Sequence, residues 1–151
     1  MAFHYKQGKY TPQHPEKYIG DPTNIVYRSS WELEVNKFFD NNPKVLNWSS
    51  EELVIPYYNP VKQRMARYFP DYYIKYMTKD GDIVYEVVEV KPLQQTRRSR
   101  SRNPRIKLVE DLTAAVNAAK WAAATEWCTA KQTETGQSHK FRVITETSIY
   151  K

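Results

Sequence analysis

The stretch from Arg67 to Pro92 decides the fold, and its sequence is RYFPDYYIKYMTKDGDIVYEVVEVKP. It holds two segments rich in aromatic and β-branched residues, which are the side chains that favour strands. Between them stands Asp80-Gly81, a dipeptide typical of a tight hairpin turn. We therefore predict that residues 67–76 and 83–91 form two neighbouring antiparallel strands, the second ended by Pro92.

Charged side chains gather at one end of this predicted pair. Side chains alternate between the two faces of a strand, so Glu89 and Lys91 share a face. An acid and a base beside apolar residues are costly to bury unless they are paired or used. The hairpin also brings Asp71 toward Glu89 at the same end of the sheet.

Two converging carboxylates at that end favour a particular chemistry. Asp71 and Glu89 would hold a hard divalent cation such as Mg²⁺ through their oxygen atoms. Lys91 would orient or help to deprotonate a water molecule that attacks phosphorus. A lone Pro-Asp is common in turns, and a lone Glu-x-Lys is commonly a solvated pair, so the combination carries the prediction.

The spacing of these residues resembles a known nuclease motif. Pro70-Asp71, 17 intervening residues and then Glu89-Val90-Lys91 match the pattern of the PD-(D/E)xK superfamily. The order of elements over about residues 25–147 looks like the TnsA-like branch of that superfamily. The other features that carry this likeness are Ser29-x-x-Glu32, a long tryptophan-containing helix and the late segment Val143-Ile144-Thr145-Glu146.

A second likeness lies near the start of the chain. Tyr18-Ile19-Gly20-Asp21-Pro22, Ile25-Val26-Tyr27-Arg28-Ser29 and Phe69-Pro70-Asp71 are similar to the head completion nucleases of T-even-type tailed bacteriophages. The resemblance implies double-stranded DNA as substrate, and phage head, portal or neck proteins as partners. It also implies a place in the host cytoplasm during assembly or in the virion.

The resemblance assigns a role to each motif residue. Asp71 and Glu89 would be metal ligands, and the backbone carbonyl of Val90 would be a third. Lys91 would be the catalytic lysine, and Glu32 the additional acid that completes the metal site. The implied cofactor is Mg²⁺, with Mn²⁺ as an alternative.

Glu32 has a structural alternative, and two glutamines are weaker candidates. Ser29-x-x-Glu32 also fits a capping box, in which Glu32 would bond the backbone at the start of a helix. Glu34, two residues later, is the alternative acid on this helix. Gln94 and Gln95 follow the motif directly and are predicted substrate contacts.

The positive charge of the chain is concentrated in one segment. Of 151 residues, 23 are Lys or Arg and 17 are Asp or Glu, which gives a net charge of +6. Six cationic residues and no acid lie between residues 92 and 107, and the remainder balances at 17 against 17. These residues are Arg97, Arg98, Arg100, Arg102, Arg105 and Lys107. We predict that they bind DNA phosphates with little sequence readout; a solvated loop or contact with an acidic protein surface are the alternatives.

The pattern of the whole chain indicates an α/β (α+β) protein with a restriction-endonuclease-like PD-(D/E)xK core. We predict an irregular N-terminal arm over residues 1–27 and a nuclease domain over 28–151, with a mixed central sheet flanked by helices. The expected helices begin at Ser29 or Ser30 and at Asn103-Pro104, and the second ends near Gly136. Its expected apolar stripe is Leu108, Leu112, Ala115, Ala119, Ala122 and Trp127. The other expected strands are 45–48, 52–55 and 141–145, with a turn at Pro56 and 59–60.

Composition excludes several other classes of protein. No apolar run approaches the ~20 residues of a membrane helix, and the first residues lack the apolar core of a secretory signal. The single cysteine, Cys128, forms no intrachain disulfide and no thiolate zinc site. Four glycines provide no phosphate-cradling loop, which disfavours nucleotide hydrolysis. The three histidines are scattered and are expected at the surface.

These observations favour a Mg²⁺-dependent DNA endonuclease or end-trimming nuclease that acts in phage head completion. Two alternatives remain open. One is a structural head protein that binds DNA or the portal without cleaving. The other is a TnsA-like transposition or repair endonuclease.

Overall fold

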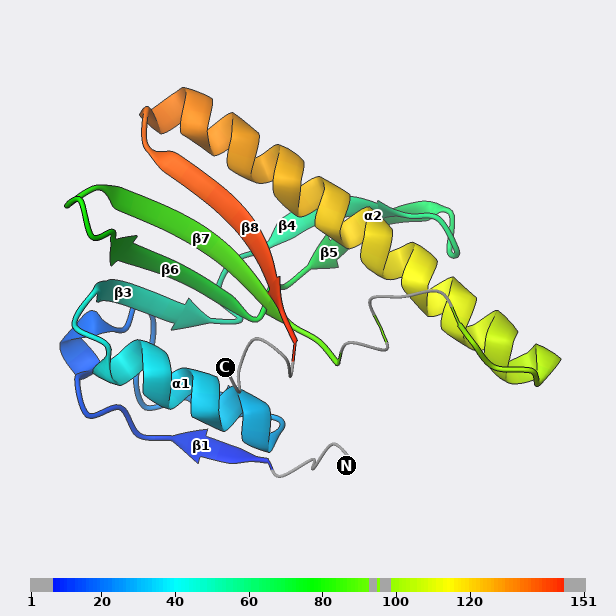
Figure 1. The fold of residues 1–151 in the computed structure, drawn as a ribbon, viewed down its shortest axis with the longest axis horizontal. Coiled ribbons are helices and arrows are strands. Elements are labelled where there is room, and N and C mark those ends of the chain that lie inside the picture. Colours follow the sequence, from blue (N-terminus) through cyan, green and yellow to red (C-terminus); the bar gives the residue numbers. More distant parts are fainter. Residues whose placement is uncertain (1–6, 93–94, 96–98, 146–151) are drawn as a thin grey trace.

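A four-stranded mixed sheet divides the protein into two layers (Figure 1). The computed structural model describes residues 7–92, 95 and 99–145. The strand order is β3 (Val45–Ser50), β6 (Tyr72–Met77), β7 (Ile83–Val90) and β8 (Ser138–Ile144). The first three pair antiparallel, and β8 runs parallel to β7. The predicted fold class, a mixed sheet flanked by helices, is confirmed.

The decisive hairpin forms as predicted, with one difference. Strands β6 and β7 pair from Tyr72↔Val88 to Met77↔Ile83 around the turn at Gly81. The single strand predicted over 67–76 is two strands, because β5 (Arg64–Tyr68) ends before Pro70 and belongs to a separate ribbon. The break places Asp71 directly before β6.

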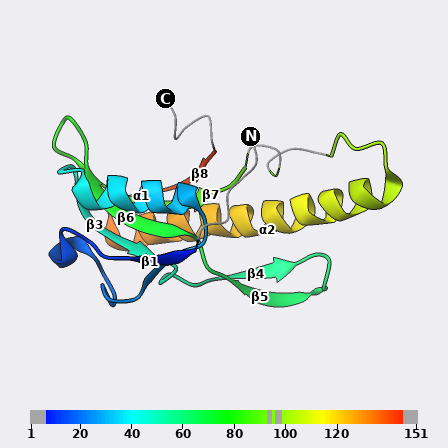
Figure 2. The same ribbon diagram turned by 90° about the horizontal axis from the view of Figure 1, so that it is seen from below.

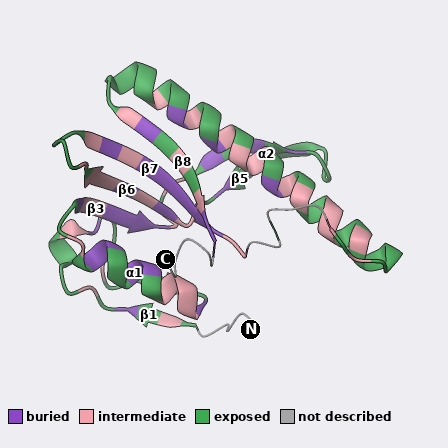
Figure 3. Cartoon of the chain, viewed as in Figure 1, coloured by how far each residue is buried: buried purple, intermediate pink, exposed green. Residues whose placement is uncertain are grey.

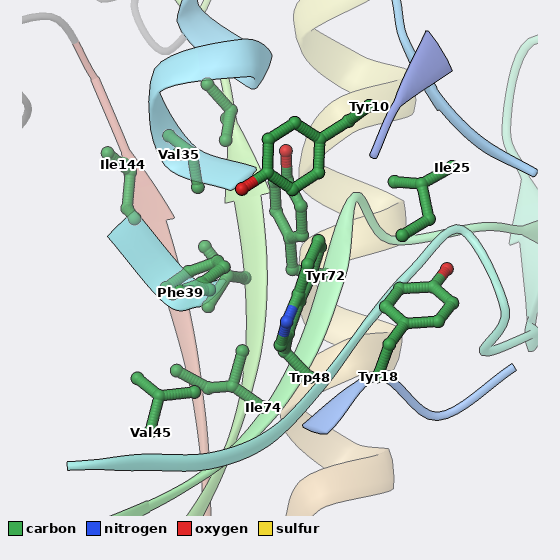
Figure 4. Close-up of a cluster of buried hydrophobic side chains, with 12 residues drawn as sticks. Tyr10, Tyr18, Ile25, Val35, Phe39, Val45, Trp48, Tyr72, Ile74 and Ile144 are labelled. Carbon is green, nitrogen blue, oxygen red and sulfur yellow. The ribbon is translucent and has the colours of Figure 1, made fainter. Parts of the chain in front are cut away.

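One face of the sheet is covered by α1 (Ser30–Asn41) and by the N-terminal segment. Ser29 begins the helix, and its Oγ accepts a hydrogen bond from the backbone amide of Glu32 at 3.2 Å. Aromatic rings form the centre of this core, with Phe39 5.0 Å from Tyr72 and Tyr18 4.8 Å from Trp48 between ring centroids (Figure 4). The buried residues of this layer are Tyr10, Tyr18, Ile25, Val35, Phe39, Val45, Trp48, Tyr72, Ile74, Val88, Val90 and Ile144.

The described part of the predicted irregular N-terminal arm contains two short strands. Strands β1 (Gly8–Tyr10) and β2 (Ile25–Tyr27) pair antiparallel, and a 3₁₀ turn, η1 (Pro15–Lys17), lies between them. The segment is ordered because its apolar side chains complete the core, with Ile25 only 1% exposed. The division of the chain at residue 28 stays a prediction.

The opposite face is covered by α2 (Pro104–Thr135) and by a ribbon of β4 (Ile55–Asn59) and β5 (Figures 1 and 2). Asn103 caps α2 as predicted, accepting bonds from two backbone amides of the first turn. Gly136 ends it in a left-handed conformation, with φ of 74°. The buried residues of this layer are Ile55, Tyr57, Tyr68, Val87, Ala124 and Cys128.

Two local expectations in this layer are wrong. The strand predicted over 52–55 begins only at Ile55, and Pro56 lies within β4 rather than in a turn. Proline fits there because the two-stranded ribbon leaves one side of each strand unpaired. The apolar stripe predicted on α2 is wrong in part. Leu108 is 60% exposed because the helix extends beyond the sheet (Figure 3), and Ala115 and Ala122 are exposed as well.

Within the described part of the chain, neither helix combines the length and the apolar character that crossing a bilayer requires.

Candidate active site at the ends of β6 and β7

Asp71 is held at the start of β6 by two backbone contacts. The register that pairs Tyr72 with Val88 places Asp71 opposite Glu89 in the next position. The backbone amide of Val90 donates to Asp71 Oδ2 at 2.7 Å. The amide of Glu51 donates to the Asp71 carbonyl at 3.1 Å. The carboxylate is therefore positioned by the sheet itself, beside the last residues of β7.

Glu89 is buried at 4% exposure and is bound at both oxygen atoms. The hydroxyl of Tyr68 donates to Oε1 at 2.7 Å, and Lys91 Nζ lies 3.3 Å from Oε2. A buried carboxylate needs such partners because desolvation otherwise disfavours its charge. Lys91 keeps 27% of its side chain exposed, so the pair opens to solvent on the lysine side.

The two acids repel each other in this arrangement. Burial raises the pKa of Asp71 well above its usual range, and the nearby charge of Glu89 raises it further. The charge of Glu32 adds to this effect, while the Val90 amide and Lys91 oppose it. Two converging carboxylates whose repulsion is incompletely offset form a donor set that suits a hard divalent cation.

Glu32 lies near this pair and also contacts the start of α1. Its pKa is raised by burial and then by the charge of Glu51, while contacts with Arg28 and Ser29 lower it. The Tyr72 hydroxyl donates to its backbone carbonyl at 3.0 Å. Glu32 therefore makes the contacts of a capping residue and also acts electrostatically on Asp71.

No group of three His, Cys, Asp or Glu side chains in the described ranges stands close enough to hold a metal ion. Glu32 therefore does not join Asp71 and Glu89 in such a group. Glu34, the alternative acid, points to solvent and lies 3.8 Å from Lys37.

Two residues that the sequence reasoning missed lie near Glu89. Tyr68 donates to it from β5, and Lys120 comes from α2. Lys120 Nζ lies 5.6 Å from the Tyr68 ring centroid and 5.8 Å from that of Tyr57. Helical spacing held a signal for Lys120, since it falls one turn before the buried Ala124 on the sheet-facing side.

Glu51 is a further neighbour that sequence reasoning missed. It forms a two-bond contact with Arg28, at 3.1 and 3.2 Å, and its φ of 56° is uncommon for a residue other than glycine. Nothing in the sequence marks that backbone conformation.

The predicted DNA-binding segment is only partly within the described chain. Arg97, Arg98 and Gln94 lie outside it. Gln95, Arg100, Arg102 and Arg105 are exposed, and Lys107 lies 3.2 Å from Asp111. The stretch before α2 is tethered to that helix, because Ser99 Oγ donates to Glu110 Oε1 at 2.8 Å.

One of the three histidines is not at the surface as expected. His139 is buried, stacks on Tyr85 with ring centroids 4.7 Å apart, and lies 3.3 Å from the Tyr73 hydroxyl. Cys128 is buried and packs in the core, as expected, and burial raises the pKa of its thiol to about 11.

Known proteins are similar to the chain over most of its length. The family model for the N-terminal part of TnsA-like endonucleases matches residues 42–146. The head completion nuclease of Enterobacteria phage T4 is 32% identical over 148 residues, covering 94% of this chain and 92% of that protein. No solved structure matches the chain. The family match spans Asp71, Glu89 and Lys91, whereas Glu32 lies before it.

Proposed function

The chain belongs to the TnsA-like endonuclease family, and from this membership we propose that it is a metal-dependent DNA endonuclease that acts in phage head completion. The proposal assigns the reaction to the end of β6 and β7. The observation that carries it is the approach of two carboxylates, Asp71 and Glu89, with the Val90 amide on one and Lys91 on the other.

The donor set supports a divalent cation at this place. Asp71 and Glu89 would hold it, with the Val90 carbonyl as a further proposed ligand and Mg²⁺ as the proposed ion. Glu32 stands outside this donor set and is proposed to act on it through its charge. When bound, such a cation supplies positive charge that stabilises the phosphorane-like transition state and makes water more acidic. The raised pKa of Asp71 supports this assignment, because a cation would offset the repulsion from Glu89.

The residues of the chain then have distinct tasks. Glu89 is kept in place by Tyr68, and Lys91 is presented toward solvent by its position after the last residue of β7. Lys91 orients the attacking water or the phosphate. The water oxygen bonds to phosphorus, one phosphorus–oxygen bond of the DNA backbone breaks, and the leaving oxygen takes up a proton.

The exposed arginines supply binding rather than chemistry. Arg100, Arg102 and Arg105 lie before and at the first turn of α2. Fifteen residues of helix separate Arg105 from Lys120, which at 1.5 Å per residue is about 22 Å. DNA that crosses the active site and follows α2 would meet these arginines at a neighbouring part of its backbone. Such contacts weaken steeply with salt.

A cleavage assay tests the proposal. Linear and supercoiled DNA are incubated with the protein, with Mg²⁺ or with EDTA, alongside Asp71→Ala and Lys91→Ala. Asp80→Ala and Lys79→Ala, in the exposed hairpin turn, are the matched controls. We expect Mg²⁺-dependent cleavage that both controls keep and both site variants lose. Cleavage that persists in both site variants would overturn the assignment.

The same assay separates the two other functions. A structural head protein would bind DNA through its arginines and cleave nothing under either condition. The similarity to the phage T4 head completion nuclease covers 92% of that protein's length. This coverage supports the head role over transposition or repair.

A further inference from the structure

Lys120 stands out among the lysines of α2 because it faces the ribbon of β4 and β5. It is half-buried, and its ammonium group lies over the rings of Tyr57 and Tyr68, at 5.8 and 5.6 Å from their centroids. The Tyr68 hydroxyl donates a hydrogen bond to Glu89. The residue whose ring packs against Lys120 therefore also contacts the proposed metal ligand. Lys120 is thus fixed at the wall of the active site.

The ammonium has neighbours of both charges but no direct anionic partner. Burial lowers the pKa of Lys120, Lys91 lowers it further, and Glu89 and Asp71 raise it. Among the described residues, no carboxylate lies within 4.0 Å of its Nζ, and no hydrogen bond engages it. A tyrosine face attracts a cation without using its N–H groups. The three donors of Lys120 therefore remain available for oxygen atoms from outside the chain.

Another lysine of the same helix shows the contrast. Lys131 lies 5.7 Å from the Trp127 ring centroid, and Glu134 lies 3.5 Å from its ammonium. Its environment is an ordinary surface ion pair over an aromatic ring. Lys120 has the ring contacts without the ion pair, although a partly buried ammonium needs an anion more.

The nearer lysine of the active site is already engaged. Lys91 Nζ lies 3.3 Å from Glu89, so part of its charge is offset within the protein.

A polar group also lies one turn before Lys120 on the same helix face. The Nδ2 of Asn117 is buried, and none of the described residues accepts a hydrogen bond from it.

We propose that Lys120 binds a phosphate of the DNA strand being cut, on the α2 side of Asp71 and Glu89. It is a second substrate-contacting lysine beside Lys91, and the Tyr57 and Tyr68 rings hold it in place. This inference rests on the proposed nuclease function. It adds to the site a residue that the motif spacing does not contain.

The test measures DNA binding and cleavage separately. Binding of the full chain to a fluorescent double-stranded oligonucleotide is followed by anisotropy in EDTA over a range of salt concentrations. Lys120→Met removes the charge and keeps the stem, Lys120→Arg keeps the charge, and Lys131→Met is the matched control. Melting curves of all variants report folding.

We expect Lys120→Met to weaken binding and kcat/KM about 10- to 100-fold, the range of one charge-assisted contact. The slope of log affinity against log salt should fall by about 0.9, as for one lost phosphate contact. Lys120→Arg and Lys131→Met should stay close to wild type. Wild-type affinity and slope in Lys120→Met would overturn the inference. So would equal losses in Lys120→Met and Lys120→Arg with lowered melting temperatures, which would indicate a structural role.

Failure of the inference and failure of the proposed function give different results. If Asp71→Ala cleaves like wild type, the proposed active site is wrong, whatever Lys120 does. If Asp71→Ala is inactive and Lys120→Met binds and cleaves normally, the active site stands and Lys120 has no part in it.

Discussion

Asp71 and Val90 are joined by a hydrogen bond of 2.7 Å, from the backbone amide of Val90 to the Asp71 carboxylate. Val90 lies between Glu89 and Lys91, so this bond fixes one acid to the strand that carries the other two motif residues. One partner of this bond is a backbone amide, so the bond holds the motif halves together more rigidly than a contact between two flexible side chains would.

The first prediction concerns the repulsion at this place. Asp71→Asn keeps an oxygen for the Val90 amide and removes the charge that faces Glu89. In EDTA at neutral pH we expect the variant to melt a few degrees above wild type, at ~2–4 °C for each kcal/mol gained. Added Mg²⁺ should raise the Tm of wild type and leave that of Asp71→Asn unchanged.

The pH dependence of this effect has a definite sign. The pKa of Asp71 is higher in the folded than in the unfolded chain, so folding favours its protonated form. That stabilisation is present below the unfolded pKa and is lost as pH rises through the folded pKa. The Tm gap between Asp71→Asn and wild type should therefore open with rising pH. A constant gap, or one equal to that of Asp80→Asn in the hairpin turn, would contradict the prediction.

The second prediction concerns the tyrosine that holds Glu89. Tyr68→Phe keeps the ring and removes the hydroxyl that donates to Glu89 Oε1. The buried carboxylate of Glu89 then lacks one hydrogen bond. We expect a loss of about 1–3 kcal/mol in unfolding free energy and a lower kcat with nearly unchanged KM for DNA. Tyr57→Phe is the control, because its hydroxyl contacts Asn59 rather than Glu89. Equal effects in both variants would show that Tyr68 acts only through packing.

The difference between Tyr68 and Glu89 shows what the sequence can predict. The Asp80-Gly81 turn is a local signal, and it sets the register that brings Asp71 opposite Glu89. Tyr68 belongs to a ribbon whose position depends on packing against α2, and no local pattern encodes that contact. The position of Lys120 near the site also depends on this packing, since Lys120 lies on α2, about thirty residues after Glu89 in the chain.

The two short strands of the N-terminal segment were not predicted, for a related reason. Its prolines and glycines interrupt every local period, so the sequence indicates irregular structure. The order comes from tertiary contacts, in which Tyr18 packs on Trp48 and Asp40 accepts bonds from the amides of Gln13 and His14. The opposite error occurs in the exposed half of α2. Its apolar residues have the spacing of a buried stripe, but none of the described elements packs against them.

The third prediction separates the two roles of Glu32. Glu32→Gln keeps a polar side chain for the helix start and removes the charge near Asp71. If the charge acts in the reaction, cleavage falls while Tm stays within about 2 °C of wild type. Ser29→Ala removes the cap that accepts the Glu32 amide and should cost about 1 kcal/mol of stability without loss of cleavage. Full cleavage by Glu32→Gln would restrict Glu32 to the capping role.

The fourth prediction concerns the contact that ties the N-terminal segment to α1. Lys17 Nζ donates to the carbonyls of Phe39, Asp40 and Asn42 at 2.8 to 2.9 Å, and so satisfies the unpaired end of the helix. Lys17→Met keeps the stem and removes these charged donors, at a cost of about 2–3 kcal/mol. The Tm should fall by roughly 4–12 °C, while cleavage well below that temperature stays normal because Lys17 is remote from the reacting groups. Lys37→Met, on the exposed side of the same helix, is the matched control, since its 3.8 Å ion pair with Glu34 contributes little. Melting of Lys17→Met at the wild-type temperature would mean that the segment before α1 is not anchored through this lysine.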